Sequence, residues 1–461
     1  MMRRRHLLAA SAAAAVLALP LVATAPAPAG AAPTRAAGHR SPLLASFRSP
    51  PSDTACLAAY SVDCYTPAQI ARAYGVDRLH AAGTDGRGVT IAVVDSFGSP
   101  TIAGDLAAFD RHFGLPDPPS LRTITPAGPV PRYDGSDDRA GWAGETTLDV
   151  EWAHVMAPGA AILVVATPTS ETEGITGFPD IIKAMRSVIS HHQADIISLS
   201  LGATEQTFSG ARQIEALSRS VLPYAKSQGV TVLSSSGDTG PTDYRLDGVT
   251  IYRTKVNSWP SSDPLVTSVG GTRLHLAASG ARTAPDAAWG GGSGFGAGGG
   301  GVSSVFARPS YQSGVARAVG PHRGTPDVSM NAAAESSVDL YSTFDRSSGP
   351  WGIAAGTSEA APLMAGIVAL ADQQAGGRIG WIDPLLYRGR GGHPLAGLSD
   401  VTHGTNTVVD QPSGRRATVT THGYLATHGY DLATGLGTVD APTFVPALAQ
   451  AAIAAHQVTR R

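Results

Sequence analysis

The sequence is poor in cysteine, in charged residues and in aromatic residues. Only two of its 461 residues are cysteine, 15% are charged and 6% are aromatic. The 34 lysines and arginines nearly balance the 36 aspartates and glutamates, which argues against a nucleic-acid partner and against an acidic solvating tail. Beyond the N-terminal region, no run approaches the roughly 20 uninterrupted apolar residues of a membrane span, so we expect a mature chain that is soluble and has no membrane partner.

Hydrophobic and turn-forming residues are abundant instead. Hydrophobic residues make up 43% of the chain, which is enough for a large core in one big domain or in two to three ordinary ones. The 54 glycines and 33 prolines indicate many tight turns and long loops.

The N-terminal residues have the pattern of an export signal. Three arginines at positions 3–5 precede an apolar run at 7–22, and small residues follow at 29–31. We therefore predict a signal peptide over 1–31 and a secreted, extracellular protein. The arginine run is also compatible with a twin-arginine export route.

Composition changes again after the signal. Residues 32–55 are rich in alanine, proline, serine and arginine, and are predicted to be a linker or a short pro-segment. Residues 56–461 are predicted to form a single domain. In an oxidising compartment we expect Cys56 and Cys64 to form a disulfide; the alternative is two unpaired thiols.

Short apolar runs alternate with helical patterns through the domain, which predicts an α/β fold. The pattern is typical of a doubly wound, mostly parallel sheet with helices on both faces. Active residues of such sheets gather where strands end and helices begin. The predicted strands are 89–94, 161–165, 195–200 and 230–233, and the predicted helices are 101–113, 180–191 and 213–228.

Residues 355–366 (AGTSEAAPLMAG) place a serine between a Gly-Thr turn and an apolar helix. Ser358 is therefore expected at a helix N-terminus, where free N–H groups and the helix dipole favour developing negative charge. Such a position suits a nucleophile whose substrate forms an oxyanion. A serine hydroxyl also needs a base. His403, in a His-Gly-Thr segment, is one candidate for this base. Because it follows the serine in the sequence and lies in a loop-like context, we interpret the occurrence of this segment as chance.

A candidate base lies in residues 144–160, which are predicted to be helical. Glu145 and Asp149 are four residues apart and so share one helix face. Buried together, the two carboxyls would share protons and raise one pKa. A solvated acidic face is the alternative, but the apolar neighbours favour a buried helix.

Asp238 ends a predicted strand in the segment 234–240 (SSSGDTG). An aspartate donates a hydrogen bond only when it is protonated. Taken alone, this segment is compatible with an ordinary surface turn.

The order Glu145, Asp149, Asp238, Ser358 resembles the catalytic set of the sedolisin family, the serine-carboxyl peptidases of the subtilase superfamily. The resemblance extends from about residue 65 to 448 and implies a subtilisin-like fold and a secreted endopeptidase that acts on proteins or peptides. Further matching segments are 157–160 (APGA), 326–329 (PDVS), 399–406 (SDVTHGTN) and 429–437 (GYDLATGLG).

The resemblance implies a role for each of the four residues. Ser358 would attack the peptide carbonyl, and Glu145 would serve as general base and then acid. Asp149 would orient Glu145, as the third member of a triad does. Protonated Asp238 would help to hold the oxyanion, which implies activity at acidic pH.

The resemblance also implies one structural calcium ion near the C-terminus. Its ligands would be the carboxylates of Asp400 and Asp431 and the backbone carbonyls of Val401, Thr427 and Gly429. Hard oxygen ligands of this kind suit calcium. Thr427 stands where the family commonly has glycine. The alternative is that Asp400 and Asp431 are ordinary loop residues that bind no metal.

Two other functions are weighed against the serine-carboxyl peptidase. A subtilisin-type protease would use Asp95, His154 and Ser358, which occur in the right order, although His154 lacks the His-Gly-Thr context. A non-catalytic binding protein on the same fold is the other alternative. Asp95 is interpreted either as a partner of Asp149 or as a turn residue.

Besides Thr427, the sequence departs from the family in three places. The segment before the serine reads Ala-Gly-Thr-Ser rather than Ser-Gly-Thr-Ser, and Glu359 replaces a small residue. Glu359 either tunes pH dependence or specificity or points to solvent. The residues before position 65 are too few for the family's long pro-domain. We expect a monomer.

Overall fold

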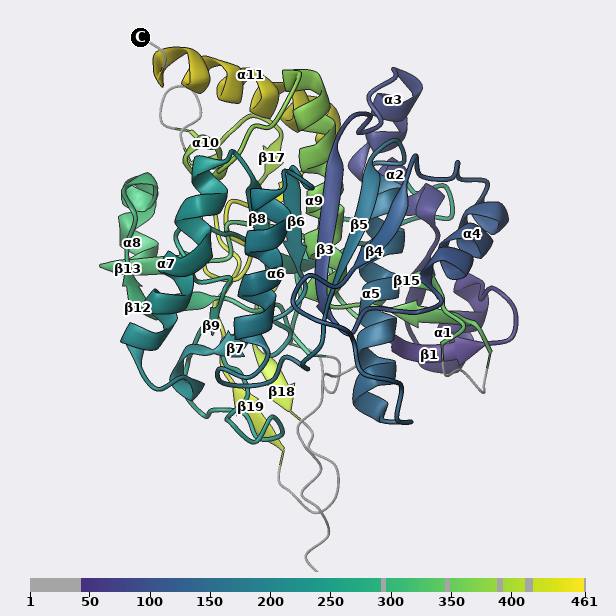
Figure 1. Cartoon of the computed structure of the whole chain (residues 1–461), viewed down its shortest axis with the longest axis horizontal. Coiled ribbons are helices and arrows are strands. Elements are labelled where there is room, and N and C mark those ends of the chain that lie inside the picture. Colours follow the sequence, from purple (N-terminus) through teal and green to yellow (C-terminus); the bar gives the residue numbers. More distant parts are fainter. Residues whose placement is uncertain (1–42, 292–295, 345–348, 388–392, 411–417, 460–461) are drawn as a thin grey trace, which may run out of the picture. The chain divides into compact units, whose positions relative to one another are not determined.

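The computed structural model describes residues 43–291, 296–344, 349–387, 393–410 and 418–459 (Figure 1). These residues all belong to one unit, 37–461. The predicted signal peptide, 1–31, lies outside the described residues. Among the described residues, none of the helices is long and apolar enough to cross a membrane.

A parallel sheet forms the centre of this unit. Its spatial order is β4-β5-β3-β6-β8-β10-β14, and the short strand β11 (Ala287–Ala288) pairs antiparallel with the end of β10. The mostly parallel α/β sheet predicted from the sequence is thus confirmed. The parallel strands are β3 (Thr90–Ser96), β4 (Leu121–Ile124), β5 (Ala161–Thr167), β6 (Ile196–Leu199), β8 (Thr231–Ser235), β10 (Thr267–Arg273) and β14 (Val328–Asn331).

Both faces of this sheet are buried, which explains the continuous apolar runs. On β3, Ile91 and Val93 join one hydrophobic cluster, while Ala92 and Val94 join a second cluster on the opposite face. Successive strand side chains point to opposite faces, so a strand covered on both sides needs apolar residues throughout.

Helices cover the two faces as predicted. The first cluster includes residues of α2 (Pro67–Tyr74), α3 (Val76–Ala81), α4 (Ile102–Phe113), α5 (Asp137–Met156), α9 (Thr357–Ala375) and α11 (Ala441–Thr459). The second includes residues of α6 (Phe178–Ser190) and α7 (Ala211–Ser227). The three predicted helices correspond to α4, α6 and α7.

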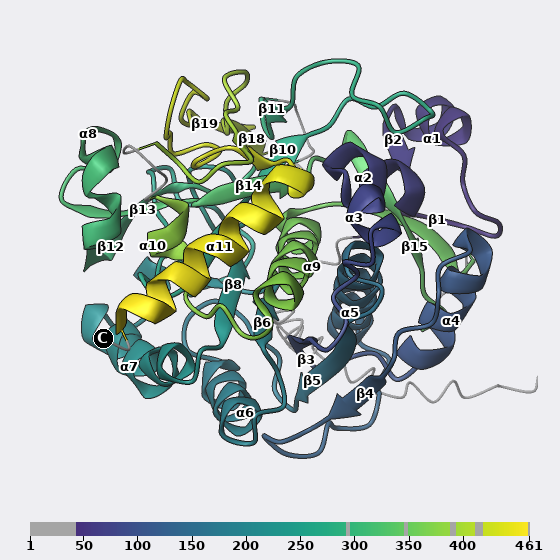
Figure 2. The ribbon, with the colours of Figure 1, turned by 90° about the horizontal axis from the view of Figure 1, so that it is seen from above.

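Helices α5 and α9 pack side by side on the first face (Figure 2). Their approach is close, because a Cβ built on Gly366 of α9 would lie 2.4 Å from the Cβ of Met156 of α5. This contact explains why α9 is rich in small residues and is buried nearly all round. It also holds the two helices that carry Glu145 and Ser358 in one arrangement.

A second sheet combines two strands near the start of the described chain with two later strands, in the order β1-β16-β15-β2. Its strands are β1 (Leu43–Phe47), β16 (Trp351–Ala354), β15 (Ser336–Tyr341) and β2 (Asp63–Tyr65). The described part of the segment 32–55 is therefore not an unstructured linker, because β1 pairs antiparallel with β16 and α1 (Asp53–Tyr60) begins before residue 55. The alternative of a short pro-segment stays a prediction.

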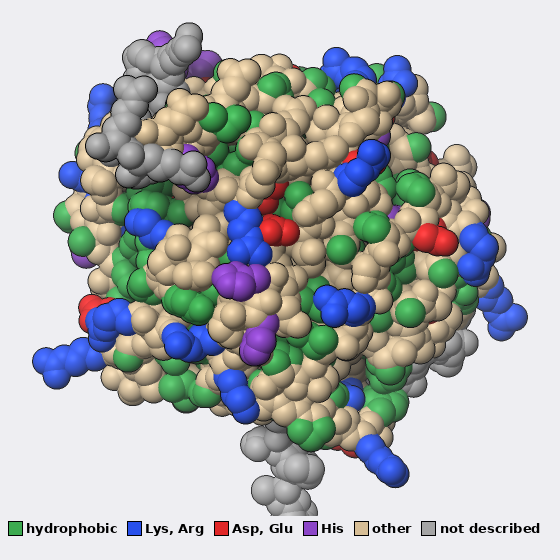
Figure 3. Space-filling model, turned by 45° about the horizontal axis from the view of Figure 1, so that its top comes forward, with side chains coloured by type: hydrophobic (Ala, Val, Ile, Leu, Met, Phe, Trp, Pro, Cys, Tyr) green, Lys and Arg blue, Asp and Glu red, His purple; other side chains and the backbone are tan. Residues whose placement is uncertain are grey.

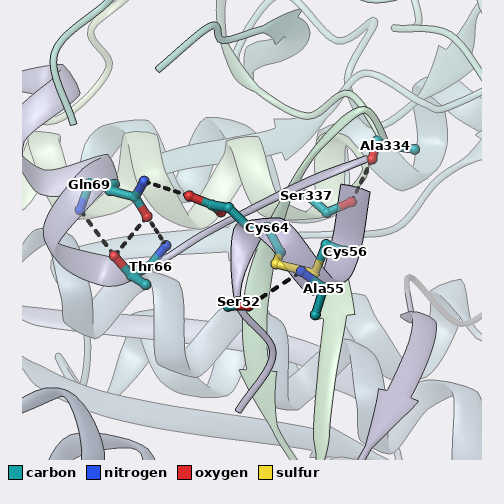
Figure 4. Close-up of a disulfide and its surroundings, with 9 residues drawn as sticks. Ser52, Ala55, Cys56, Cys64, Thr66, Gln69, Ala334 and Ser337 are labelled. Carbon is teal, nitrogen blue, oxygen red and sulfur yellow. Dashed lines mark hydrogen bonds between the residues drawn. A yellow bond between two sulfur atoms is a disulfide. The ribbon is translucent and has the colours of Figure 1, made fainter. Parts of the chain in front are cut away.

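The predicted disulfide between Cys56 and Cys64 is present and joins α1 to β2 (Figure 4). Strand β2 pairs with β15, so the bridge ties the start of the domain to the second sheet. The close-up also shows the hydroxyl of Ser337 donating to the carbonyl of Ala334, at 2.6 Å.

The remaining elements are short. They are β7 (Ala203–Thr204), β9 (Ser258–Trp259), β12 (Gly301–Ala307), β13 (His322–Thr325), β17 (Leu398–Ser399), β18 (Val408–Asp410), β19 (Val419–Thr421), β20 (Thr438–Val439), α8 (Ala316–Val319), α10 (Asp383–Leu386) and the 3-10 turns η1 (Glu205–Thr207) and η2 (Ser310–Val315). On the face shown in Figure 3, the basic side chains are spread out rather than gathered in one patch.

Candidate active site

A pocket of about 360 Å³ opens at the carboxyl edge of the central sheet. Its lining comes from the ends of β6 and β8, the loop after β5, and the two helices α5 and α9. This is the edge at which parallel α/β sheets place their ligands. Glu145, Asp238 and Ser358 all line the pocket.

Ser358 lies in the first turn of α9, and only 9% of its surface is exposed. The preceding Gly356 has a φ of 123°, which L residues with a Cβ rarely adopt. Its N–H donates to the carbonyl of Ala332 at 2.8 Å, just beyond β14. The sharp entry into α9 therefore depends on glycine, and it brings the serine to the helix N-terminus at the pocket wall.

Asp238 follows β8 and caps the first turn of α9 from outside the helix, whose own N-cap residue is Gly356. Its Oδ1 accepts hydrogen bonds from the N–H and the hydroxyl of Thr357, both at 2.8 Å. Asp238 is exposed because one side of it faces the pocket, but protein atoms surround its carboxyl on the other sides. This desolvation, opposed by the bonds from Thr357 and aided by the charge of Glu145, raises the pKa of Asp238 to about 6.

Glu145 and Asp149 are both buried on α5, so the solvated acidic face weighed for this pair is wrong. Glu145 lines the pocket, whereas Asp149 lies behind it. The hydroxyl of Ser200 donates to Asp149 Oδ1 at 2.8 Å and contacts the carbonyl of Ser358 at 3.3 Å. Burial, followed by the charges of Asp95 and Glu145, raises the pKa of Asp149 well above its usual value.

Asp95 and His154, the other members of the alternative triad, are not brought together with the serine. Asp95 is buried at the end of β3, where its charge acts on Asp149, as expected of a partner of that residue. His154 contacts the carbonyl of Pro116 at 2.8 Å and Asp110 at 3.4 Å. Burial lowers the pKa of His154 to about 4, and the residue does not line the pocket.

Glu359 points into the core rather than to solvent. It is fully buried, and its Oε1 accepts a hydrogen bond from the Asn331 amide at 2.9 Å. Burial raises the pKa of Glu359 well above its usual value. Trp142 is likewise buried, donates to Ser170 and does not line the pocket. His403 lies in a loop beside β11, where its carbonyl accepts from Ala288.

Several pocket residues were missed by the sequence analysis. Ser200 sits at the end of a predicted strand, which is the available signal for it, but a serine there has no motif of its own. Glu171, Glu173 and Asp243 also line the pocket, and they come from loops with no recognised pattern. Part of the glycine-rich run reaches the pocket through Gly296, while residues 292–295 lie outside the described residues.

The two C-terminal segments expected to bind calcium lie next to each other. The N–H of Gly429 donates to Asp400 Oδ2 at 2.9 Å, and that of Thr427 donates to Asp431 Oδ2 at 2.7 Å. Carboxylates and backbone carbonyls are the hard oxygen donors that calcium prefers, so the residue types fit. Such a site would depend heavily on carbonyls such as that of Val401, because the described residues hold no metal-binding group of three acidic, histidine or cysteine side chains.

Fold and pocket together define a class: a subtilisin-like α/β protein whose serine shares its pocket with carboxyls. Residues 138–382, more than half of the chain, match the Subtilase family. The chain is 32% identical over 381 residues to kumamolisin of Bacillus sp. (strain MN-32), covering 81% of this chain and 61% of that protein. It is 28% identical over 390 residues to sedolisin of Pseudomonas sp. (strain 101), covering 83% and 61%.

A solved structure of Pseudomonas sedolisin, a serine-carboxyl proteinase complexed with two molecules of pseudo-iodotyrostatin, superposes with a TM-score of 0.64 at 27% identity. That match covers 83% of this chain and 96% of the solved one. The chain therefore belongs to the subtilase family and, within it, to the sedolisins. It spans about three-fifths of the length of the curated relatives given above.

Proposed function

We propose that the protein is a secreted serine-carboxyl endopeptidase that hydrolyses peptide bonds of proteins or peptides at acidic pH. The main support is the convergence of Ser358, Glu145 and Asp238 on one pocket, with Asp149 behind Glu145. No histidine lines this pocket among the described residues, so a carboxyl is the available base.

Acylation begins when Ser358 Oγ forms a bond to the peptide carbonyl carbon. The hydroxyl proton passes to Glu145, and the carbonyl electron pair moves onto the oxygen. Protonated Asp238 donates to this oxyanion, beside the N-terminal N–H groups of α9. The C–N bond then breaks as Glu145 returns the proton to the amine, which leaves an ester on Ser358.

Deacylation repeats these steps with water. Glu145 takes a proton from water as its oxygen attacks the ester, and the returning electron pair expels Ser358 Oγ, which regains its proton. Ser200 contacts both Asp149 and the carbonyl of Ser358, and Asp149 would orient Glu145. Because Glu145 must be ionised while Asp238 keeps its proton, turnover falls as pH rises past the pKa of Asp238, about 6.

We also propose that one calcium ion is held by the carboxylates of Asp400 and Asp431 and by carbonyls of Val401, Thr427 and Gly429. When bound, the ion would tie the two loops together and carry no chemical step. Export by the predicted signal and a monomeric mature protein complete the proposal.

The test is a pH–rate profile on a denatured protein substrate for the native protein, Glu145→Gln and Ser358→Ala. Glu215→Gln is the matched control, because this glutamate is exposed on α7. We expect an acid optimum, a loss of about 10²-fold or more in Glu145→Gln and no turnover in Ser358→Ala. A neutral optimum with an active Glu145→Gln would overturn the assignment in favour of a histidine base. A folded protein without turnover at any pH would favour a binding function.

A further inference from the structure

Three carboxyl side chains in the pocket take no part in the proposed reaction. Glu171 and Glu173 come from the loop after β5, and Asp243 from the loop after β8. The carboxyl ends of parallel strands meet at one edge of a sheet, so loops far apart in sequence converge here. Asp243 also accepts from the hydroxyl of Thr239 at 2.9 Å, which places it next to the segment of Asp238.

Glu173 and Asp243 are held only partly, and by neutral donors. Glu173 accepts from the N–H of Thr204 at 2.9 Å and the hydroxyl of Thr207 at 3.1 Å. Asp243 accepts from the N–H of Tyr244 at 2.8 Å and from the hydroxyl of Ser258. These bonds orient the two carboxyls but provide no cationic partner.

Glu171 has still less support. Only 5% of its surface is exposed, and its Oε1 has no hydrogen-bond partner among the described residues. A buried carboxyl oxygen without a partner is costly in a finished core. Here the oxygen belongs to a residue that lines the pocket, so a ligand in the pocket can provide the missing partner.

Among the described residues, no lysine or arginine forms an ion pair with these carboxyls. The charges that act on Glu171 come from Glu173, Asp243 and Asp138 of α5, and all are acidic. Arg139 follows Asp138, but its guanidinium stacks on the ring of Phe97 and donates to the carbonyls of Pro131 and Arg132. Two further acidic residues, Glu145 and Asp238, line the same pocket.

Burial and the neighbouring acidic charges together favour the protonated form of these carboxyls. Burial, followed by the charge of Asp243, raises the pKa of Glu173 to about 9. Burial, followed by the charges of Glu173 and Asp243, raises the pKa of Glu171 well above its usual value. A cation that enters would reverse the charge term and release these protons.

We propose that Glu171, Glu173 and Asp243 select peptide substrates with a lysine or arginine side chain next to the bond that Ser358 attacks. The inference rests on the proposed peptidase function and names its substrate class. A long basic side chain fits a pocket of about 360 Å³ and brings several N–H donors to carboxyl oxygens.

The kinetic test compares peptides that differ at one residue, the one before the cleaved bond. Arginine is set against citrulline, which has nearly the same shape without the charge. In the native protein we expect kcat/KM to favour arginine by about tenfold or more, and the ratio to rise with pH as the carboxyls ionise. Glu171→Gln and Glu173→Gln should bring the ratio towards one, because they should lower kcat/KM more for the arginine peptide than for the citrulline peptide. Exposed Glu215→Gln should keep the native ratio.

A binding test separates this inference from the proposed function. Calorimetry of Ser358→Ala with each peptide, in two buffers of different ionisation enthalpy, counts the protons released on binding. Release with arginine but not with citrulline supports the inference even if no peptide is cleaved, in which case the proposed function alone fails. Cleavage with an arginine to citrulline ratio near one at every pH, or equal proton counts for the two peptides, would overturn the inference and leave the peptidase proposal intact.

Discussion

Replacing Asp238 by asparagine tests whether a protonated acid holds the oxyanion. Asparagine can keep the Oδ1 acceptor that receives two bonds from Thr357, and its Nδ2 is a donor at every pH. Asparagine and aspartate are about equally good helix caps, so the fold should be retained. Asp238→Ala removes both the cap and the donor.

The expected magnitudes follow from the pKa of Asp238, about 6. Its protonated fraction is about nine-tenths at pH 5 and about one-tenth at pH 7, so native kcat/KM should fall roughly tenfold on this limb from this group alone. Asp238→Asn should shift the limb to higher pH. Asp238→Ala should lose about 10²–10³-fold at the acid optimum, and its unfolding free energy should drop by about 1 kcal/mol.

The assay is kcat/KM from pH 3 to 8 on one neutral peptide, with thermal unfolding of each variant as the control for folding. Two results would refute the reasoning. One is an unchanged alkaline limb in a stably folded Asp238→Asn. The other is an Asp238→Ala variant as active as the native protein at the acid optimum, since then no donor is needed at this position.

Three further predictions follow from the same structure. Gly356→Ala should abolish activity and lower stability, because the added Cβ would lie 2.6 Å from Asp238 Oδ2 and because the φ of 123° at this position is unfavourable for alanine. Activity and thermal unfolding check this prediction, and a variant that behaves like the native protein would contradict it. In urea, Ser358→Ala should unfold more easily at pH 8 than at pH 5. Burial raises the pKa of Asp372 to about 8, so the folded state binds more protons, and this stabilisation is complete at acid pH and is lost as pH rises towards 8. Asp372→Asn should reduce the difference in unfolding free energy between pH 5 and pH 8 by at most about 4 kcal/mol, and an unchanged difference would contradict the assignment. Chelation of calcium should lower the melting temperature of native protein but not of Asp400→Ala, and equal shifts in both would count against the site.

Local patterns in the sequence determined much of this protein. The alternation of apolar runs and helices predicted the parallel sheet, since strands covered on both faces must be apolar throughout. The spacing of Glu145 and Asp149 is a property of the helix itself, and so is the place of Ser358 at the start of α9. These features depend on neighbours within a few residues, which a sequence displays directly.

Only the tertiary structure decided which distant residues meet. Residues 43–47 form β1 because a partner strand, β16, lies some three hundred positions along the chain, and local composition could not reveal that pairing. Ser200 reaches Asp149 only because β6 ends beside α5, and Glu171 meets Asp243 only because two loops converge at one sheet edge. The desolvation that raises the pKa of Asp149 and Asp238 is likewise collective, since it depends on every element packed around them.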